Sequence, residues 1–97
     1  MDIQKLQRAV IDALEDVKAQ DIKVFNTTHL TSLFDRVILA SATSNRQTRA
    51  LAASVADRGR ELKLAGITIE CQDAGEWVGL YLRNIVVHVM QPPIRQY

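Results

Sequence analysis

Hydrophobic residues recur at helical spacing near the start of the chain. Within residues 3–18 they stand three or four positions apart, at Ile3, Leu6, Val10, Leu14 and Val17. This spacing places one apolar stripe along an α-helix and leaves the charged residues on the opposite side. Asp2 precedes the stripe, where its carboxylate can accept hydrogen bonds from the free amides of the first turn. The pattern predicts an amphipathic helix that packs against a core.

Three shorter segments have the length and composition of strands. Residues 22–25 are moderately β-prone, residues 36–43 form a compact apolar run, and residues 67–72 alternate between apolar and polar side chains. The run at 36–43 favours a buried central strand over a helix, because it is short and apolar. Residues 29–35 are expected to connect the first two strands.

A second and longer helix is expected between residues 43 and 66. Ser44 and Gln47 have the spacing of a capping box, which satisfies otherwise unpaired amides in the first turn. Gly66 stands where a helix end favours a residue with positive φ. Gly59 lies inside the helix, where glycine costs roughly 1 kcal/mol relative to alanine. Its presence there indicates close packing against the sheet.

The sequence "WVGLYLRNIVVHVM" at residues 77–90 alternates on both sides of Arg83-Asn84. A two-residue loop at that point pairs Leu82 with Ile85 and Trp77 with Met90. A slip of one residue would move aliphatic side chains out of the core, so the pattern fixes the register. One face of this hairpin is aliphatic and is expected to be core: Val78, Leu80, Leu82, Ile85, Val87 and Val89. The other face is mixed: Trp77, Gly79, Tyr81, Val86, His88 and Met90.

The elements follow the order αββαβββ. This order predicts an α+β fold with a mixed sheet of about five strands covered by two main helices, in a single domain over residues 1–97. The segment from Val37 to Gln72 can form a parallel crossover, whereas the final hairpin must be antiparallel.

The mixed face of the hairpin has two interpretations. A helix on that side of the sheet would make it a second layer of core. Without such a helix, Trp, Tyr and Met form an exposed patch, and these residue types are enriched where proteins bind one another. Such a patch could also bring two copies of the chain together, so the sequence leaves a homodimer open.

Composition narrows the classes of function. Twelve basic and eleven acidic residues give a net charge of +1, which disfavours a domain that binds nucleic-acid phosphates. Cys71 is the lone cysteine, so an intrachain disulfide and a cysteine zinc cluster are excluded. We expect it to be a small buried strand residue in a reducing compartment such as the cytoplasm. No apolar run reaches membrane-spanning length.

Histidine chemistry has little support in the sequence. His88 can act in acid–base catalysis in principle, but no Ser, Cys or carboxylate projects from the same face of the hairpin. His29 lies in a connector, and two histidines without patterned carboxylates make a poor metal site. We therefore expect no catalytic residue, no metal and no cofactor.

Two longer stretches carry a family pattern. They are "FDRVILASATSNRQTRALA" and "AGEWVGLYLRNIVVHVMQ". The first holds Asp35 and "ATSNRQ" at the start of the second helix, and the second holds "EWV" and "IVVHVM" in the terminal hairpin. Together with "AQDIKVFN" they closely resemble the ribosomal silencing factor family, also called the Iojap family. The resemblance covers essentially the whole chain.

The resemblance implies a regulatory protein rather than an enzyme. It implies docking on the large ribosomal subunit, on the ribosomal protein numbered fourteen, at the face that joins the small subunit. Subunit joining is then hindered, and translation is repressed when nutrients are scarce. The resemblance places the contacts in the hairpin and the start of a C-terminal tail. The matching positions here are Trp77, His88, Met90, Arg95 and Tyr97, and Tyr81 joins the expected contacts because it lies on the same face of the hairpin.

Four positions depart from the family's pattern. Tyr81 stands where an aspartate is usual, and Ala42 where a glycine is usual. An aspartate at position 81 would need solvent, which favours the exposed interpretation of the mixed face. The turn is commonly Gly-Asp in the family and is Arg83-Asn84 here. Arginine adopts positive φ reluctantly, so we expect a wider or strained turn.

Two alternative functions remain at this stage. The family's fold resembles nucleotidyltransferases, whose chemistry needs paired carboxylates on one face of a strand to hold magnesium. The strand at 67–72 offers only Glu70, and the run at 36–42 offers none after Arg36. The second alternative is an RNA-binding module that uses Arg46 and Arg49, against the dipole at the start of the second helix.

Overall fold

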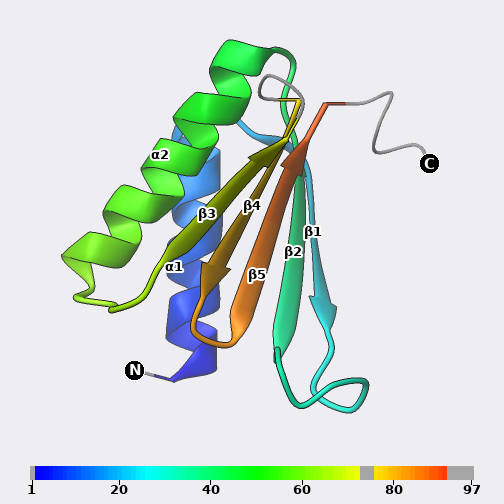
Figure 1. The fold of residues 1–97 in the computed structure, drawn as a ribbon, viewed down its shortest axis with the longest axis vertical. Helices are drawn as coiled ribbons and strands as arrows, with labels where there is room; N and C mark the ends of the chain where they lie inside the picture. Colours follow the sequence, from blue (N-terminus) through cyan, green and yellow to red (C-terminus); the bar gives the residue numbers. More distant parts are fainter. Residues whose placement is uncertain (1, 73–75, 92–97) are drawn as a thin grey trace.

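The computed structural model describes residues 2–72 and 76–91, in which two helices lie on the same side of a five-stranded sheet (Figure 1). The predicted order αββαβββ and the α+β class are confirmed. The elements are α1 (Ile3–Asp16), β1 (Gln20–Asn26), β2 (Arg36–Ser41), α2 (Asn45–Glu61), β3 (Thr68–Gln72), β4 (Trp77–Leu82) and β5 (Ile85–Met90).

The sheet is mixed, with the strand order β1-β2-β5-β4-β3. Its central pair, β2 and β5, is parallel, and every other neighbouring pair is antiparallel. The expected crossover from β2 through α2 to β3 connects two strands that run in the same direction. However, β5 and β4 lie between them, so β2 finds its parallel partner in the last strand of the described chain.

The hairpin of β4 and β5 has the predicted register. Leu82 is paired with Ile85 and Trp77 with Met90. A two-residue loop connects the strands, and Arg83 in it has φ 51°, the left-handed region that an arginine enters at a cost. The expectation of strain at this turn is thus met by the backbone, whereas the expectation of a wider turn is wrong.

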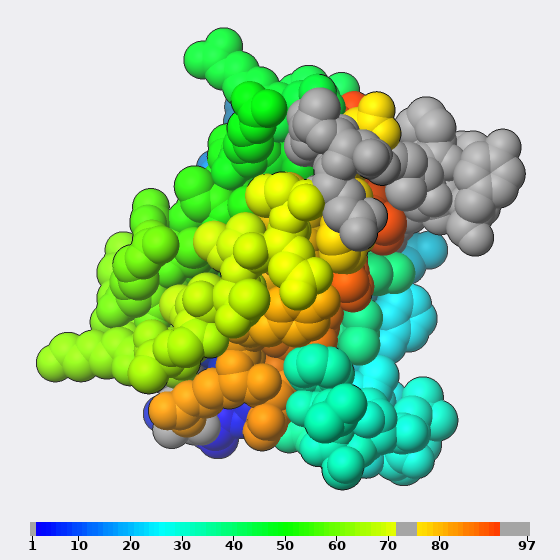
Figure 2. Space-filling model, viewed as in Figure 1, coloured from blue at the N-terminus to red at the C-terminus, as the bar shows by residue number. Residues whose placement is uncertain are grey.

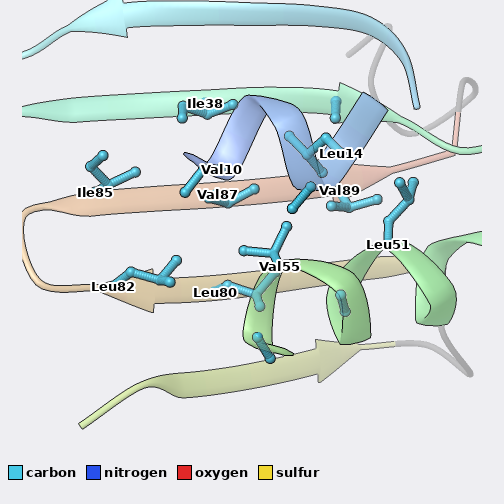
Figure 3. Packing of buried hydrophobic residues seen from close by; sticks show 14 of the residues in the cluster. Val10, Leu14, Ile38, Leu51, Val55, Leu80, Leu82, Ile85, Val87 and Val89 are labelled. Carbon is cyan, nitrogen blue, oxygen red and sulfur yellow. The ribbon is translucent and has the colours of Figure 1, made fainter. Parts of the chain in front are cut away.

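The aliphatic face of the hairpin forms the sheet side of the hydrophobic core. Each of its six residues is at most 1% exposed. Four helix residues cover this face: Val10 and Leu14 of α1, and Leu51 and Val55 of α2 (Figure 3). Ile38 of the neighbouring strand β2 is paired with Val87 and extends the same face. Because both helices cover the same side, the opposite side of the sheet is left without either of them.

Gly59 brings α2 close to the sheet, as its position in the sequence indicated. A Cβ atom at this glycine would lie 2.6 Å from Cδ1 of Ile67 and 3.1 Å from Cδ2 of Leu82. Both separations are shorter than ordinary van der Waals contact, so a side chain at position 59 would push the helix or its neighbours away.

The start of α2 is capped by two side chains. Ser44 is the N-cap, and its hydroxyl accepts a hydrogen bond of 3.1 Å from the amide of Gln47. The side-chain oxygen of Gln47 accepts from the amide of Thr43, and its nitrogen donates to the carbonyls of Val17 and Lys18 at 3.1 Å each. Gln47 therefore also ties the start of α2 to the end of α1, which the capping pattern alone did not predict.

The other end of α2 is formed by a lysine. Lys63 has φ 60°, its amide donates to the carbonyl of Arg60, and the amide of Leu64 donates to the carbonyl of Gly59. These two bonds make a Schellman motif, which offsets the cost of positive φ. The prediction that Gly66 ends the helix is therefore wrong, because that glycine lies beyond the motif in the loop to β3.

Candidate functional site

The open face, as we call it, is the side of the sheet opposite α1 and α2. The strand pairing places side chains from all five strands on it. At its centre, His88 of β5 lies between Leu39 of β2 and Gly79 of β4. The apolar and aromatic members are Phe25, Val37, Leu39, Val86, Met90, Trp77 and Tyr81. Among the described residues, the second core layer that would need a helix on this side is therefore absent.

Trp77 and His88 form a stacked pair on the open face. Their ring centroids are 5.3 Å apart, and the ring planes are inclined by 25°. The six-membered ring of the indole lies over Gly79, where a Cβ atom would be only 3.1 Å from Cη2 and 3.2 Å from Cζ2 of Trp77. Both rings of the pair are partly buried, so the indole rests against the sheet and keeps one part accessible.

The imidazole of His88 has an unusual environment for a polar ring. Its Nδ1 atom is buried, and the described part of the chain supplies it with no hydrogen-bond partner. Burial lowers the pKa of His88 below its usual value of 6.5, because the charged form loses hydration. The charged groups in the same row across the sheet are Lys23 and Glu70, each separated from His88 by one residue on an intervening strand. The ring is therefore an uncharged stacking partner at neutral pH.

The connector between β1 and β2 adds apolar surface next to Tyr81. The Phe34 ring lies against it, with centroids 6.0 Å apart and planes inclined by 38°. In the same connector Leu30 is 76% exposed and Leu33 is 70% exposed, and the connector projects from the body of the molecule (Figure 2). Phe25, which lies near the end of β1 just before the connector, is 48% exposed. The apolar surface is therefore larger than the hairpin alone.

The sequence pattern does not predict this contribution of the connector. The stretch "HLTSLFD" has no strand or helix period, so its pattern predicts only a connector. Its three large apolar residues were the available sign, since a purely linking segment is usually polar. The contact with Phe34 gives the aromatic ring at position 81 a packing partner.

The other predicted site residues are distributed as follows. Met90 lies on the open face beside Trp77 and is partly buried. Arg95 and Tyr97 lie outside the described residues. Cys71 is exposed on the edge strand β3, so its expected burial is wrong. An edge strand has a neighbour on one side only, which leaves its side chains accessible.

The arginines of α2 are partly committed to carboxylates. Arg58 is 3.1 Å from Asp16 of α1, and Arg60 is 2.8 Å from Asp57. These ion pairs neutralise charge along the helix and join it to α1. Both pairs lie further along α2 than Arg46 and Arg49, the two residues on which the RNA-binding alternative rests.

Ligand chemistry elsewhere on the molecule is sparse. Within residues 2–72 and 76–91, no three His, Cys, Asp or Glu side chains are grouped so that they could hold a metal ion. An open groove of about 900 Å³ lies between α1 and β1, and its lining mixes Lys5 and Arg8 with Asp12 and Glu15. In the same described ranges, no helix is long and apolar enough to cross a membrane.

Known proteins with this sequence pattern were found by comparison. A family model described as "Ribosomal silencing factor during starvation" matches residues 1–97. A ribosomal silencing factor from Chromobacterium violaceum is 47% identical over 100 residues, which cover 100% of this chain and 80% of that protein. One from Zymomonas mobilis is 31% identical over 96 residues, covering 99% of this chain and 72% of that protein.

Solved structures agree with the fold. A crystal structure of a Chromobacterium violaceum protein superposes with a TM-score of 0.95 at 45% identity, covering 100% of this chain and 81% of that one. A Bacillus halodurans protein gives a TM-score of 0.87 at 25% identity, covering 97% of this chain and 88% of that one. The family model spans the whole chain and the relatives share its fold, so this protein belongs to the ribosomal silencing factor family.

Proposed function

We propose that this protein binds the large ribosomal subunit through its open face and represses translation by blocking the small subunit sterically. The observation that carries the proposal is a sheet face without a helix over it, rich in aromatic and apolar side chains, in a member of the ribosomal silencing factor family. Occupation of the joining surface is sufficient for this function, so the mechanism requires no catalytic residue, cofactor or metal.

The partner on the subunit is proposed to be the ribosomal protein numbered fourteen. The central contacts are Trp77, Tyr81, His88 and Met90, and Arg95 and Tyr97 add contacts from the C-terminal tail. Trp and Tyr supply large contact area at low entropic cost, and Met adapts to irregular surfaces. A factor that acts on ribosomes in this way works in the cytoplasm.

The chemistry of the open face favours a protein partner over RNA. The face carries Lys23 and Glu70 at its two sides, so their charges offset each other. A surface that grips phosphates needs an excess of cations. We therefore expect docking that changes little with salt concentration.

A sedimentation experiment tests the proposal. Large ribosomal subunits from Chromobacterium violaceum are mixed with wild-type protein and with the Trp77→Ala or Met90→Ala variant. Because removal of a central aromatic anchor typically costs 2 kcal/mol or more, Trp77→Ala is expected to weaken co-sedimentation by about 30-fold. Met90→Ala is expected to weaken it less. Wild-type protein should also slow subunit joining in proportion to its binding.

A matched control separates docking from folding. Ile69 is 42% exposed but lies on the other side of the sheet, in register with Leu80, so Ile69→Ala should leave docking unchanged. The Trp77→Ala variant should melt within a few degrees of the wild type. Docking by Trp77→Ala at wild-type strength would contradict the proposal. Steeply salt-dependent binding to bare RNA would favour the RNA-binding alternative, and a homodimer with Trp77 at its interface would favour self-association.

A further inference from the structure

The Trp77 side chain is held by two contacts that lie outside the hydrophobic core. Its indole lies across Gly79 and stacks on His88, and neither contact belongs to the hydrophobic core beneath the helices. An exposed tryptophan on a strand would otherwise be free to exchange between rotamers.

Glycine at position 79 lowers the stability of β4, but it leaves space above the strand. Glycine in a strand has high conformational entropy when unfolded and offers no side chain to pack. Gly79 does not have a positive φ, so its backbone would accept other residues. A Cβ atom there would meet Trp77 at 3.1 Å and 3.2 Å, which is tighter than ordinary contact. The lack of a side chain at Gly79 therefore allows the indole to pack flat against the sheet.

His88 supports the indole from the neighbouring strand. It is paired directly with Gly79, so its ring borders the space that the glycine leaves open. Its buried Nδ1 has no hydrogen-bond partner among the described residues, so that atom does not hold the ring in place by a hydrogen bond. The imidazole stacks on the Trp77 indole, with ring centroids 5.3 Å apart and planes inclined by 25°.

We propose that Gly79 and His88 are positioning residues that hold the Trp77 indole flat on the open face, so that the docking anchor is ordered before the partner arrives. The part of this inference that concerns docking rests on the proposed function. The part that concerns the indole does not, because it describes the free protein. Ordering a side chain in advance removes an entropic cost from binding.

Fluorescence of the free protein tests the placement of the indole. Trp77 is the only tryptophan in the sequence, so its emission and its quenching by acrylamide report on this one site. In Gly79→Ala and in His88→Ala, the indole should become more accessible, and the quenching constant should rise about twofold or more above that of the wild type. His88→Phe keeps a flat ring for stacking and should restore the wild-type value. Thr68→Ala, at an exposed position opposite Tyr81, is the control and should change nothing.

Docking of the same variants to Chromobacterium violaceum large subunits tests the anchor. Loss of pre-ordering of one large side chain should weaken co-sedimentation by about threefold to tenfold in Gly79→Ala and in His88→Ala. His88→Phe should dock more strongly than His88→Ala, because it keeps a flat ring that stacks on Trp77. Circular dichroism confirms that each variant is folded before it is used.

The outcomes separate this inference from the proposed function. Unchanged quenching in folded Gly79→Ala and His88→Ala overturns the positioning role, whatever happens to docking. Raised quenching with unchanged docking overturns the claim that the ordered indole serves as an anchor. If the wild type itself does not dock, the proposed function fails and the anchor claim fails with it. The quenching series still decides whether Gly79 and His88 position the indole.

Discussion

His88 shows how one residue can join stability to pH. Its Nδ1 is buried without a partner, and burial lowers its pKa below 6.5. The unfolded chain therefore binds this proton more readily than the folded chain does. Above pH 6.5 the ring is neutral in both states and contributes no pH dependence. As the pH falls from 6.5 to the lower folded pKa, stability is lost, and below that value the loss stays constant.

The resulting prediction compares wild type with His88→Phe. As the pH is lowered from about 7.5 to about 5, the wild type should lose melting temperature relative to the variant, because only the wild type must hold the buried imidazole neutral. His29 is present in both proteins, so their difference isolates His88. Parallel curves would contradict the prediction. A wild type that gains relative stability in acid would show that attraction between the imidazolium and the indole face exceeds the effect of burial.

Helix ends show where a structural element departs from its sequence pattern. α1 and α2 both end with a lysine in the left-handed region, Lys18 at φ 62° and Lys63 at φ 60°. Residue preference favours glycine there, so the sequence points past the helix to Gly66. The backbone bonds from Lys63 and Leu64 decide the end instead. Which turn closes the motif depends on where the chain must leave the helix to reach β3, and local preference does not contain that information.

A substitution at this helix end should raise stability. Lys63→Gly removes the Cβ that makes positive φ unfavourable, while glycine makes the unfolded chain more flexible and offsets part of the gain. The expected net gain is about 0.5–1 kcal/mol, or roughly 2–8 °C in melting temperature. Lys63→Ala is the control, because it removes the same charge but keeps the Cβ, and it should give no such gain. Equal melting temperatures for the two variants would show that backbone strain at Lys63 is negligible.

At the scale of the whole molecule, the two faces of the sheet differ in that both helices cover one of them and neither covers the other. Alternation along the hairpin was sufficient to predict its register and its aliphatic core face, because a strand with one buried face admits one pairing. It could not show that both helices cover that same face, since the choice depends on how α1 and α2 pack on each other. It also could not show that β2 pairs with β5, because that contact joins distant parts of the chain. For the open face, Trp77, Tyr81, His88 and Met90 followed from the alternation, whereas the Phe34 contact came from a connector without a period.

Neighbouring residues on β4 test the difference between the faces. Leu80 is fully buried, and Leu80→Ala should cost about 2–5 kcal/mol in the free energy of unfolding, because it leaves a cavity in the core beneath the helices. Tyr81 lies on the open face and is partly buried, so Tyr81→Ala should cost less than about 2 kcal/mol. Urea unfolding measures both. A loss at Tyr81 as large as that at Leu80 would mean that the open face is a second core.

The parallel pairing of β2 with β5 also bears on how the protein is made. Arg36 pairs with Ile85, so the middle of the sheet is completed by a strand that leaves the ribosome after the other four described strands. Until then β1 is the one neighbour of β2 in the sheet. The apolar stripes of α1 and α2 also lack the aliphatic face of the hairpin against which they pack. Cooperative folding must therefore wait for the hairpin. A nascent chain that stops before β4 would expose the apolar surface that the finished molecule buries, and chaperones and proteases recognise such surface.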